Sequence, residues 1–135
     1  MQRIEFPNWT RFAIVIVVVI AAYFSIKHQK SNQKDLEARG RYNIGETTGT
    51  VTNHRSSKTA IYYTYPYNGL IYKASMQESS IKNIKTKGGK YLIVFDPLNP
   101  KNSKMLFNKE VDYTTVINYK DTGWTKVPDF VIMKK

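Results

Sequence analysis

The sequence predicts a mainly β protein in which a single N-terminal transmembrane helix precedes a small antiparallel β domain, either a sandwich or a partly open barrel. Three observations lead to this fold class. Residues 12–26 are apolar and uncharged, the pattern after residue 41 changes to alternation bounded by turn residues, and Asn68-Gly69 separates two runs rich in Tyr, Ile and Thr. At 135 residues the chain is short for more than one domain.

The composition supports a packed core and excludes several kinds of site. Hydrophobic residues make up 41% and aromatic residues 13% of the chain, which is enough for a folded domain. There is no cysteine, so disulfide scaffolds, thiolate zinc sites and cysteine nucleophiles are excluded. Lys and Arg number 21 against 10 Asp and Glu, and the resulting formal charge of +11 favours anionic partners.

Changes in composition divide the chain into four segments. We expect an N-terminal tail at 1–8, a transmembrane helix at 9–26, a charged juxtamembrane stalk at 27–41 and a β domain at 42–135. The stalk has only Leu36 and Ala38 as interior-type side chains, so a helix here could bury little of any face. Gly40 is a natural stop for a membrane helix that continues through the stalk.

Residues 9–26 have the length and the flanks of a membrane anchor. Eighteen residues rise roughly 27 Å as an α-helix, close to the ~30 Å hydrocarbon core of a bilayer. Arg11 can extend to the near interface, and Trp9 and Tyr23 suit the headgroup layers. The expected anchor residues are Trp9, Arg11, Phe12, Ile16, Ile20, Tyr23 and Lys27.

Two other interpretations of the apolar run stay open. A buried parallel strand could be as rich in Val and Ile, although the run is about twice the length of a usual strand. A cleaved signal peptide would have a basic start and an apolar region at residues 14–22. Its cleavage site would be poor, because the bulky Tyr23 and Phe24 follow Ala22.

The flanking cations favour a single-pass protein of the cell (inner) membrane with a cytoplasmic β domain. Five cations follow the apolar run within fifteen residues, and two precede it. Asp35 and Glu37 weaken this preference, and an N-terminal signal anchor can translocate a long C-terminal part. A periplasmic or extracellular domain is therefore the alternative. The cations are Arg3 and Arg11 before the run, and Lys27, Lys30, Lys34, Arg39 and Arg41 after it.

Residues 61–76 give the clearest β element, a hairpin. Asn68-Gly69 permits positive φ at both central residues of a type I′ turn, so the loop has two residues. The resulting register places eight side chains on one face, which we expect to be the core face. The pairs are Tyr67 with Leu70, Tyr65 with Tyr72, Tyr63 with Ala74 and Ile61 with Met76.

Pro66 lies on the opposite face and predicts an opening in the sheet. It faces Ile71 in a non-hydrogen-bonded pair, so its missing N–H costs the hairpin ladder nothing. The N–H is instead missing on the edge of the first hairpin strand that faces away from the second. No third strand should therefore pair with the first strand near Pro66. The opening and its neighbours form a candidate partner-binding surface, through strand addition or lateral packing. Its residues are Tyr62, Thr64, Pro66 and Lys73.

Other β elements have weaker signals. Ile81 and Ile84 are three residues apart, so residues 79–85 fit one helical turn and a short strand equally well. The remaining expectations are an extended segment at 47–54 with a bulge at Gly49, a buried strand at 90–95 after a Gly88-Gly89 turn, a turn at 96–100, a brief apolar return at 105–107, and short extended or irregular pieces at 111–119 and 124–133.

The order of three motifs resembles a small bacterial family of unknown function. The motifs are "GTVT", "YYTYPYNGLIY" and "GGKYLIVFDPLNPKNSKML", which together cover about residues 48–107. Members typically join one membrane helix to a compact β domain with a "YDP.NP" turn, and this chain has Phe95 where they tend to carry tyrosine. The resemblance implies a fold and a membrane location, but no activity.

No constellation of residues indicates an enzyme, a metal site or a cofactor. His54 lies among polar residues, and Asp96 before Pro97 suits the first position of a type I turn better than a metal ligand. Glu110 and Asp112 would share one side of an expected strand, but no third group completes a catalytic site. We therefore expect a protein that is not an enzyme and binds no cofactor.

A lysine cluster is the second candidate surface. Lys82, Lys85, Lys87 and Lys90 fall within nine residues and would attract anionic lipid or nucleic acid. Tyrosines next to lysines also resemble a base-stacking platform. The hairpin register sends most of these tyrosines to the core face, so nucleic acid is not the expected partner.

The sequence therefore predicts binding rather than catalysis. We expect a single-pass membrane-anchored β interaction module, an accessory or structural subunit of a membrane protein assembly. Its partners would be the lipid bilayer and a membrane or membrane-proximal protein. The alternative is a membrane-tethered electrostatic binder of anionic lipid or nucleic acid through the lysine cluster.

Overall fold

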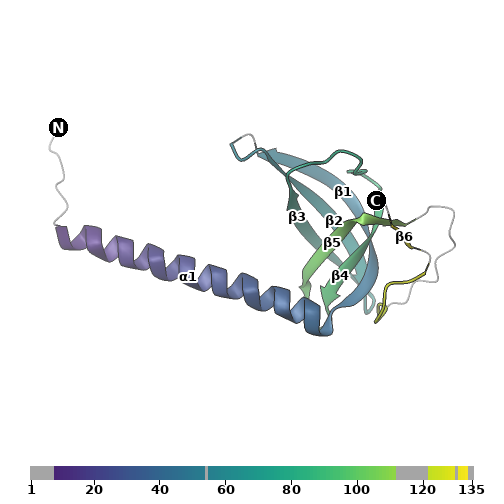
Figure 1. Ribbon diagram of the computed structural model, residues 1–135, viewed down its shortest axis with the longest axis horizontal. Coiled ribbons are helices and arrows are strands. Elements are labelled where there is room, and N and C mark those ends of the chain that lie inside the picture. The colour runs from purple at the N-terminus through teal and green to yellow at the C-terminus, as the bar shows by residue number, and fades with distance from the viewer. Residues whose placement is uncertain (1–7, 54, 112–121, 130, 134–135) are drawn as a thin grey trace. The chain divides into compact units, whose positions relative to one another are not determined.

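The computed structural model describes residues 8–53, 55–111, 122–129 and 131–133. Within them it contains one helix followed by six strands (Figure 1). The chain forms two compact units, Met1–Lys34 and Asp35–Lys135. The elements are α1 (Asn8–Arg39), β1 (Arg41–Asn53), β2 (Lys58–Tyr67), β3 (Leu70–Glu78), β4 (Lys90–Asp96), β5 (Asn99–Val111) and β6 (Val131–Met133).

Helix α1 runs without interruption through the apolar run and the stalk. It is the one helix among the described residues that is long and apolar enough to cross a membrane. No part of its most apolar 18-residue stretch is buried. By length and composition, such a helix at the N-terminus fits both a membrane anchor and a signal sequence. Gly40 ends it, as expected. The Gly40 N–H donates to the Leu36 carbonyl at 3.0 Å, and a Cβ at Gly40 would lie 2.2 Å from that oxygen. Glycine therefore lets the chain turn directly into β1.

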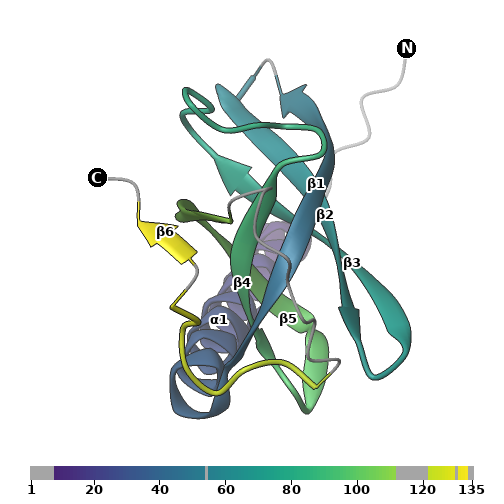
Figure 2. The same cartoon turned by 90° about the vertical axis from the view of Figure 1, so that its right-hand side faces the viewer.

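The six strands form one antiparallel sheet in the order β3-β2-β1-β4-β5-β6 (Figures 1 and 2). The sheet curls strongly. The Tyr63 hydroxyl on β2 lies 3.1 Å from the Ser103 hydroxyl on β5, although β1 and β4 lie between these strands in the sheet. In the described part of the chain the sheet stays open between its edges, β3 and β6. The mainly β fold class is confirmed, and a single curled sheet corresponds to the partly open barrel rather than to a sandwich.

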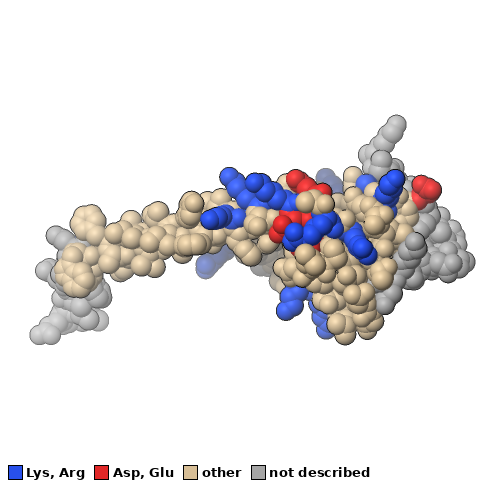
Figure 3. Space-filling view, turned by 90° about the horizontal axis from the view of Figure 1, so that it is seen from below, with Lys and Arg blue, Asp and Glu red and all other residues tan. Residues whose placement is uncertain are grey.

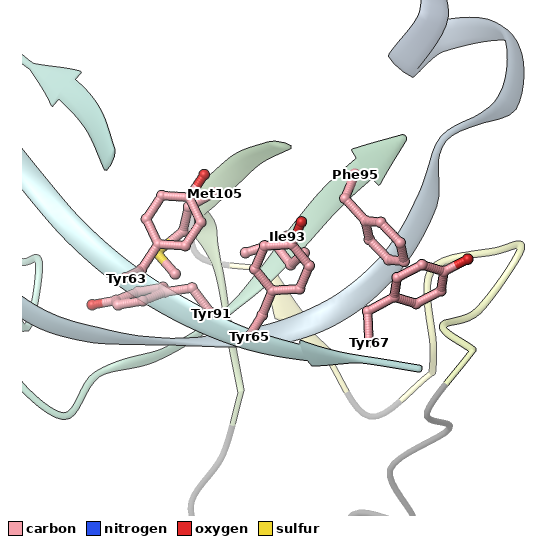
Figure 4. Packing of buried hydrophobic residues seen from close by; sticks show 7 residues of the cluster. All are labelled: Tyr63, Tyr65, Tyr67, Tyr91, Ile93, Phe95 and Met105. Atoms are coloured by element: carbon pink, nitrogen blue, oxygen red, sulfur yellow. The ribbon is translucent and has the colours of Figure 1, made fainter. Parts of the chain in front are cut away.

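The concave face of the sheet holds the core. Side chains of β2 alternate, so that Ile61, Tyr63 and Tyr65 are buried while Tyr62 is 43% exposed. Tyr65 donates its hydroxyl to the Pro100 carbonyl on β5. Burial raises the pKa of both the Tyr63 and Tyr65 hydroxyls above the ordinary tyrosine value. The core cluster, shown in Figure 4, consists of Tyr63, Tyr65, Tyr67, Tyr91, Ile93, Phe95 and Met105.

The β2–β3 hairpin has the predicted register throughout. Asn68 and Gly69 have φ values of 49° and 72°, as a type I′ turn requires. The expected core face is also confirmed, with one correction at Leu70, which is 60% exposed. The ring of Tyr72 packs against Tyr65 and Tyr67. Tyr72 therefore covers the end of the core, and Leu70 lies beyond it at the hairpin tip.

Three other expectations are corrected. β1 begins at Arg41 rather than at residue 47, and β5 spans thirteen residues rather than 105–107. Both extensions are mostly polar or small in sequence, with Ile44 as the buried aliphatic residue of the first, and both pair with β4 along its backbone. Residues 79–85 form turns, and neither a helical turn nor a strand, because this segment crosses from edge strand β3 to β4. The expected bulge near Gly49 is confirmed by the register shift between Thr47 and Gly49, and so is a strand after Gly88-Gly89.

Candidate functional site

Strands β1 and β2 separate near Pro66, as the missing N–H predicts. Their ladder ends at the Glu46–Thr64 pair, whereas β1 continues to pair with β4 as far as Arg41. Asn43 fills the gap. Its side-chain amide donates to the Pro66 carbonyl at 2.6 Å, and its Oδ1 accepts the Ile44 N–H at 2.8 Å. The fully buried Asn43 side chain thus replaces one backbone contact between the two strands.

The structure brings the four candidate partner-binding residues together on the outer face of the hairpin. Tyr62, Thr64 and Pro66 alternate along β2, and Lys73 on β3 pairs directly with Thr64. Ile71 pairs with Pro66 on the same face and is 66% exposed, so it belongs to this surface although it was not among the predicted residues. We call this surface the hairpin face: Tyr62, Thr64, Pro66, Ile71 and Lys73.

Two shallow depressions flank Thr64 on the hairpin face. The larger, about 390 Å³, combines the apolar Ile44, Pro66 and Ile71 with the charged Glu46 and Lys90. The smaller, about 250 Å³, is lined by residues that include Thr48, Tyr62 and Lys73. The hairpin face therefore offers apolar surface with charged groups beside it, a composition that suits contact with a protein.

The lysine cluster is divided between two places. Lys82, Lys85 and Lys87 are exposed on the segment between β3 and β4, whereas Lys90 begins β4 and lines the larger depression. Thr47 holds the segment. Its hydroxyl donates to the Lys85 carbonyl at 2.7 Å and accepts the Gly89 N–H at 2.8 Å. The first three lysines are thus presented by an anchored loop.

The antiparallel order gives the sheet two distinct ends. One end, which we call the proximal end, contains the last turn of α1, the start of β1, the β2–β3 turn and the β4–β5 turn (Figure 2). The segment with Lys82, Lys85 and Lys87 follows β3 at the opposite, distal end. In Figure 3 the apolar part of α1 carries no charged side chain on the visible face, and Lys and Arg gather on the rest of the described chain.

Asp96 at the proximal end forms an ion pair that the sequence did not predict. Arg39 donates from Nε to Oδ1 and from Nη2 to Oδ2 of Asp96, both at 2.8 Å, although 57 residues separate them. Asp96 also accepts the Leu98 N–H at 3.0 Å, which confirms its role as a turn former. Hydrogen bonds from Arg39 lower the pKa of this buried carboxyl below its ordinary value, against the opposing effect of burial.

The described residues include no group of three or more His, Asp or Glu side chains that could hold a metal ion. His54 and Asp112 lie outside the described residues, so the structure does not describe the Glu110–Asp112 pair. No family model, curated protein or solved structure matches the chain. The resemblance over residues 48–107 stays an expectation.

Proposed function

We propose that this chain is a single-pass membrane-anchored β interaction module, an accessory or structural subunit of a membrane protein assembly. Residues 9–26 would hold it in the cell membrane, with the β domain on the cytoplasmic side that the flanking cations favour. The hairpin face would bind a membrane or membrane-proximal protein.

The anchor is supported by the side chains of α1. Phe12, Ile16 and Ile20 are about half exposed or more, and none of the most apolar window of the helix is buried. A contiguous apolar surface of this size is unfavourable in water and favourable in hydrocarbon. A cut after Ala22 would place the bulky Ile20 three residues before it, where signal peptidase sites need a small residue, and this argues against cleavage there.

One observation carries the binding role: the hairpin face exposes Tyr62 and Ile71 beside Lys73, over two depressions. Exposed aromatic and aliphatic groups next to a cation suit a partner with an apolar side chain and a carboxylate. Lateral packing is favoured over strand addition between β1 and β2, since the Asn43 amide already occupies the Pro66 carbonyl.

The test combines Tyr62→Ala with Lys73→Ala in the full chain, purified with its partners from native membranes in mild detergent. We expect partner recovery to fall about tenfold, because an exposed tyrosine at an interface centre commonly contributes more than 1 kcal/mol. The thermal midpoint should move by no more than about 2 °C, since both side chains are outside the core.

The matched control is Val51→Ala with Lys104→Ala, which removes one exposed aliphatic and one exposed lysine elsewhere on the sheet. It should leave recovery unchanged. Equal recovery of partners by the Tyr62/Lys73 variant and the control would remove the hairpin face from the proposal.

The alternative function, electrostatic binding of anionic lipid or nucleic acid, is favoured by the anchored loop that presents Lys82, Lys85 and Lys87. Salt distinguishes the two functions. Retention through these lysines should weaken steeply between low and moderate ionic strength, whereas apolar contact through the hairpin face should hardly respond.

A further inference from the structure

We propose that the larger depression of the hairpin face binds an arginine side chain of the partner protein, whose guanidinium donates to the Ile44 carbonyl and to the Glu46 carboxylate. This inference rests on the proposed function, because it names a group that the partner brings to the same surface. It adds a buried polar contact to the apolar group and the carboxylate already expected of that partner.

The strand ladder determines which way the main-chain groups of β1 face. Tyr42 exchanges both of its main-chain hydrogen bonds with Trp124, at 2.7 Å each, so its N–H and carbonyl face away from β4. Alternate residues of a strand face the same neighbour, and β1 pairs with β4 without a register shift. The N–H and carbonyl of Ile44 therefore also face away from β4, toward the gap that β2 leaves.

Pro66 lies opposite Ile44 and offers its carbonyl no donor. The last pair of β1 with β2 is Glu46 with Thr64, so the antiparallel register continues to Ile44 opposite Pro66. A regular ladder has two hydrogen bonds at such a pair, one in each direction. The Asn43 amide bridges the first, from the Ile44 N–H to the Pro66 carbonyl. The second needs an N–H on Pro66, which proline lacks.

The Ile44 carbonyl is therefore a buried acceptor that the described strands leave unpaired. Ile44 is only 3% exposed, and an unpaired main-chain carbonyl away from water costs free energy comparable to a lost hydrogen bond. A donor from another molecule would recover this cost. The larger depression gives such a donor access, because both Ile44 and Pro66 line it.

The groups around this acceptor favour a cationic donor with an apolar stem. Glu46 lies two residues farther along β1 and lines the same depression. Its side chain is exposed, and the ion pairs within the described chain do not include it. Pro66 and the 66% exposed Ile71 add apolar walls. A carbonyl, a carboxylate and apolar walls together suit a long basic side chain.

Arginine fits these groups better than lysine does. Its planar guanidinium carries five N–H donors on three nitrogen atoms, so it can reach two acceptors from one position. The lysine ammonium has its three donors on a single nitrogen atom and is more strongly hydrated. The methylene groups of either side chain can pack against Pro66 and Ile71.

The cations of the surface suit the rest of the partner. Lys90 is opposite Glu46 in the β1–β4 ladder and lines the larger depression, and Lys73 lies on the hairpin face. Both can meet the carboxylate that the proposed function assigns to the partner. The partner segment would therefore carry an arginine close to an acidic residue, which complements charges of both signs on this surface.

The direct test titrates the full chain in detergent micelles with N-acetyl-arginine amide, and with N-acetyl-citrulline amide as the matched uncharged control. Nuclear magnetic resonance follows the Ile44 carbonyl carbon and the Glu46 amide. We expect saturable shifts at both, with an affinity for the arginine compound about fivefold or more above that for the citrulline compound. Equal affinities, or no saturable shift with the arginine compound, would overturn the arginine site.

Substitutions separate this inference from the proposed function. Glu46→Gln should abolish the preference for the arginine compound and lower partner recovery about fivefold. Glu78→Gln, the same exchange at the far end of β3, should change neither. Full recovery by Glu46→Gln, with loss of the partner from the Tyr62/Lys73 variant, would overturn the arginine contact and leave the hairpin face intact. Full recovery by both variants would remove the hairpin face itself.

Discussion

Asp96 keeps its charge in a nearly solvent-free position because Arg39 meets both of its carboxylate oxygens. The turn at Asp96 was predictable from the sequence. The sequence Asp96-Pro97 indicates a turn, and the Leu98 N–H contact confirms it. The ion pair was not predictable, since only the completed sheet brings residue 39 to residue 96. The same is true of Asn43, whose role depends on where β2 leaves β1.

Replacement of Arg39 by Met should lower stability most at neutral pH. The lowered pKa of Asp96 means that its ion pair stabilises the fold above the ordinary Asp pKa of about 3.9, and that this contribution is lost as the pH falls through the native value. The variant leaves a buried carboxylate without its cation, so its thermal midpoint should fall by several degrees at pH 7.

Thermal unfolding at pH 7 and at pH 3, followed by circular dichroism, measures this effect. The difference between wild type and Arg39→Met should shrink at pH 3. Lys101→Met, which removes an exposed cation near the same turn, should have little effect at either pH. A difference that is equal at both pH values would show that Arg39 acts through packing rather than through Asp96.

At the scale of elements, local signals predicted the hairpin well. Asn68-Gly69 determines the type of turn, and the turn determines the register of the hairpin. This register places the tyrosines of β2 in the core, except for Tyr62, which is exposed. Local signals failed for the first half of β1 and for most of β5. These segments are mostly polar or small, and they are strands because β4 offers them a backbone ladder. Non-local pairing of this kind leaves no periodic pattern in the sequence.

Replacement of Gly69 by Ala should destabilise the β2–β3 hairpin by about 1 kcal/mol, because a φ of 72° places a Cβ in the disfavoured left-handed region. Amide hydrogen exchange should accelerate mainly in β2 and β3. Gly49→Ala is the matched control, since its φ is not positive and nothing lies within 4 Å of the added Cβ. Equal effects of the two substitutions would contradict the role of the type I′ turn.

At the scale of the whole molecule, the chain combines an exposed apolar helix with a small curled sheet whose polar core groups are paired. Among the described residues that are not exposed, each buried side-chain nitrogen or oxygen atom has a hydrogen-bond partner.

The most direct test of this account is the fate of residues 9–26 in cells. Membranes are washed with alkaline carbonate, and the mass of the chain is measured in the pellet and in the supernatant. We expect the chain in the pellet, with a mass that includes residues 9–26. A chain that begins after Ala22 and appears in the supernatant would contradict the membrane anchor, and with it the proposed function.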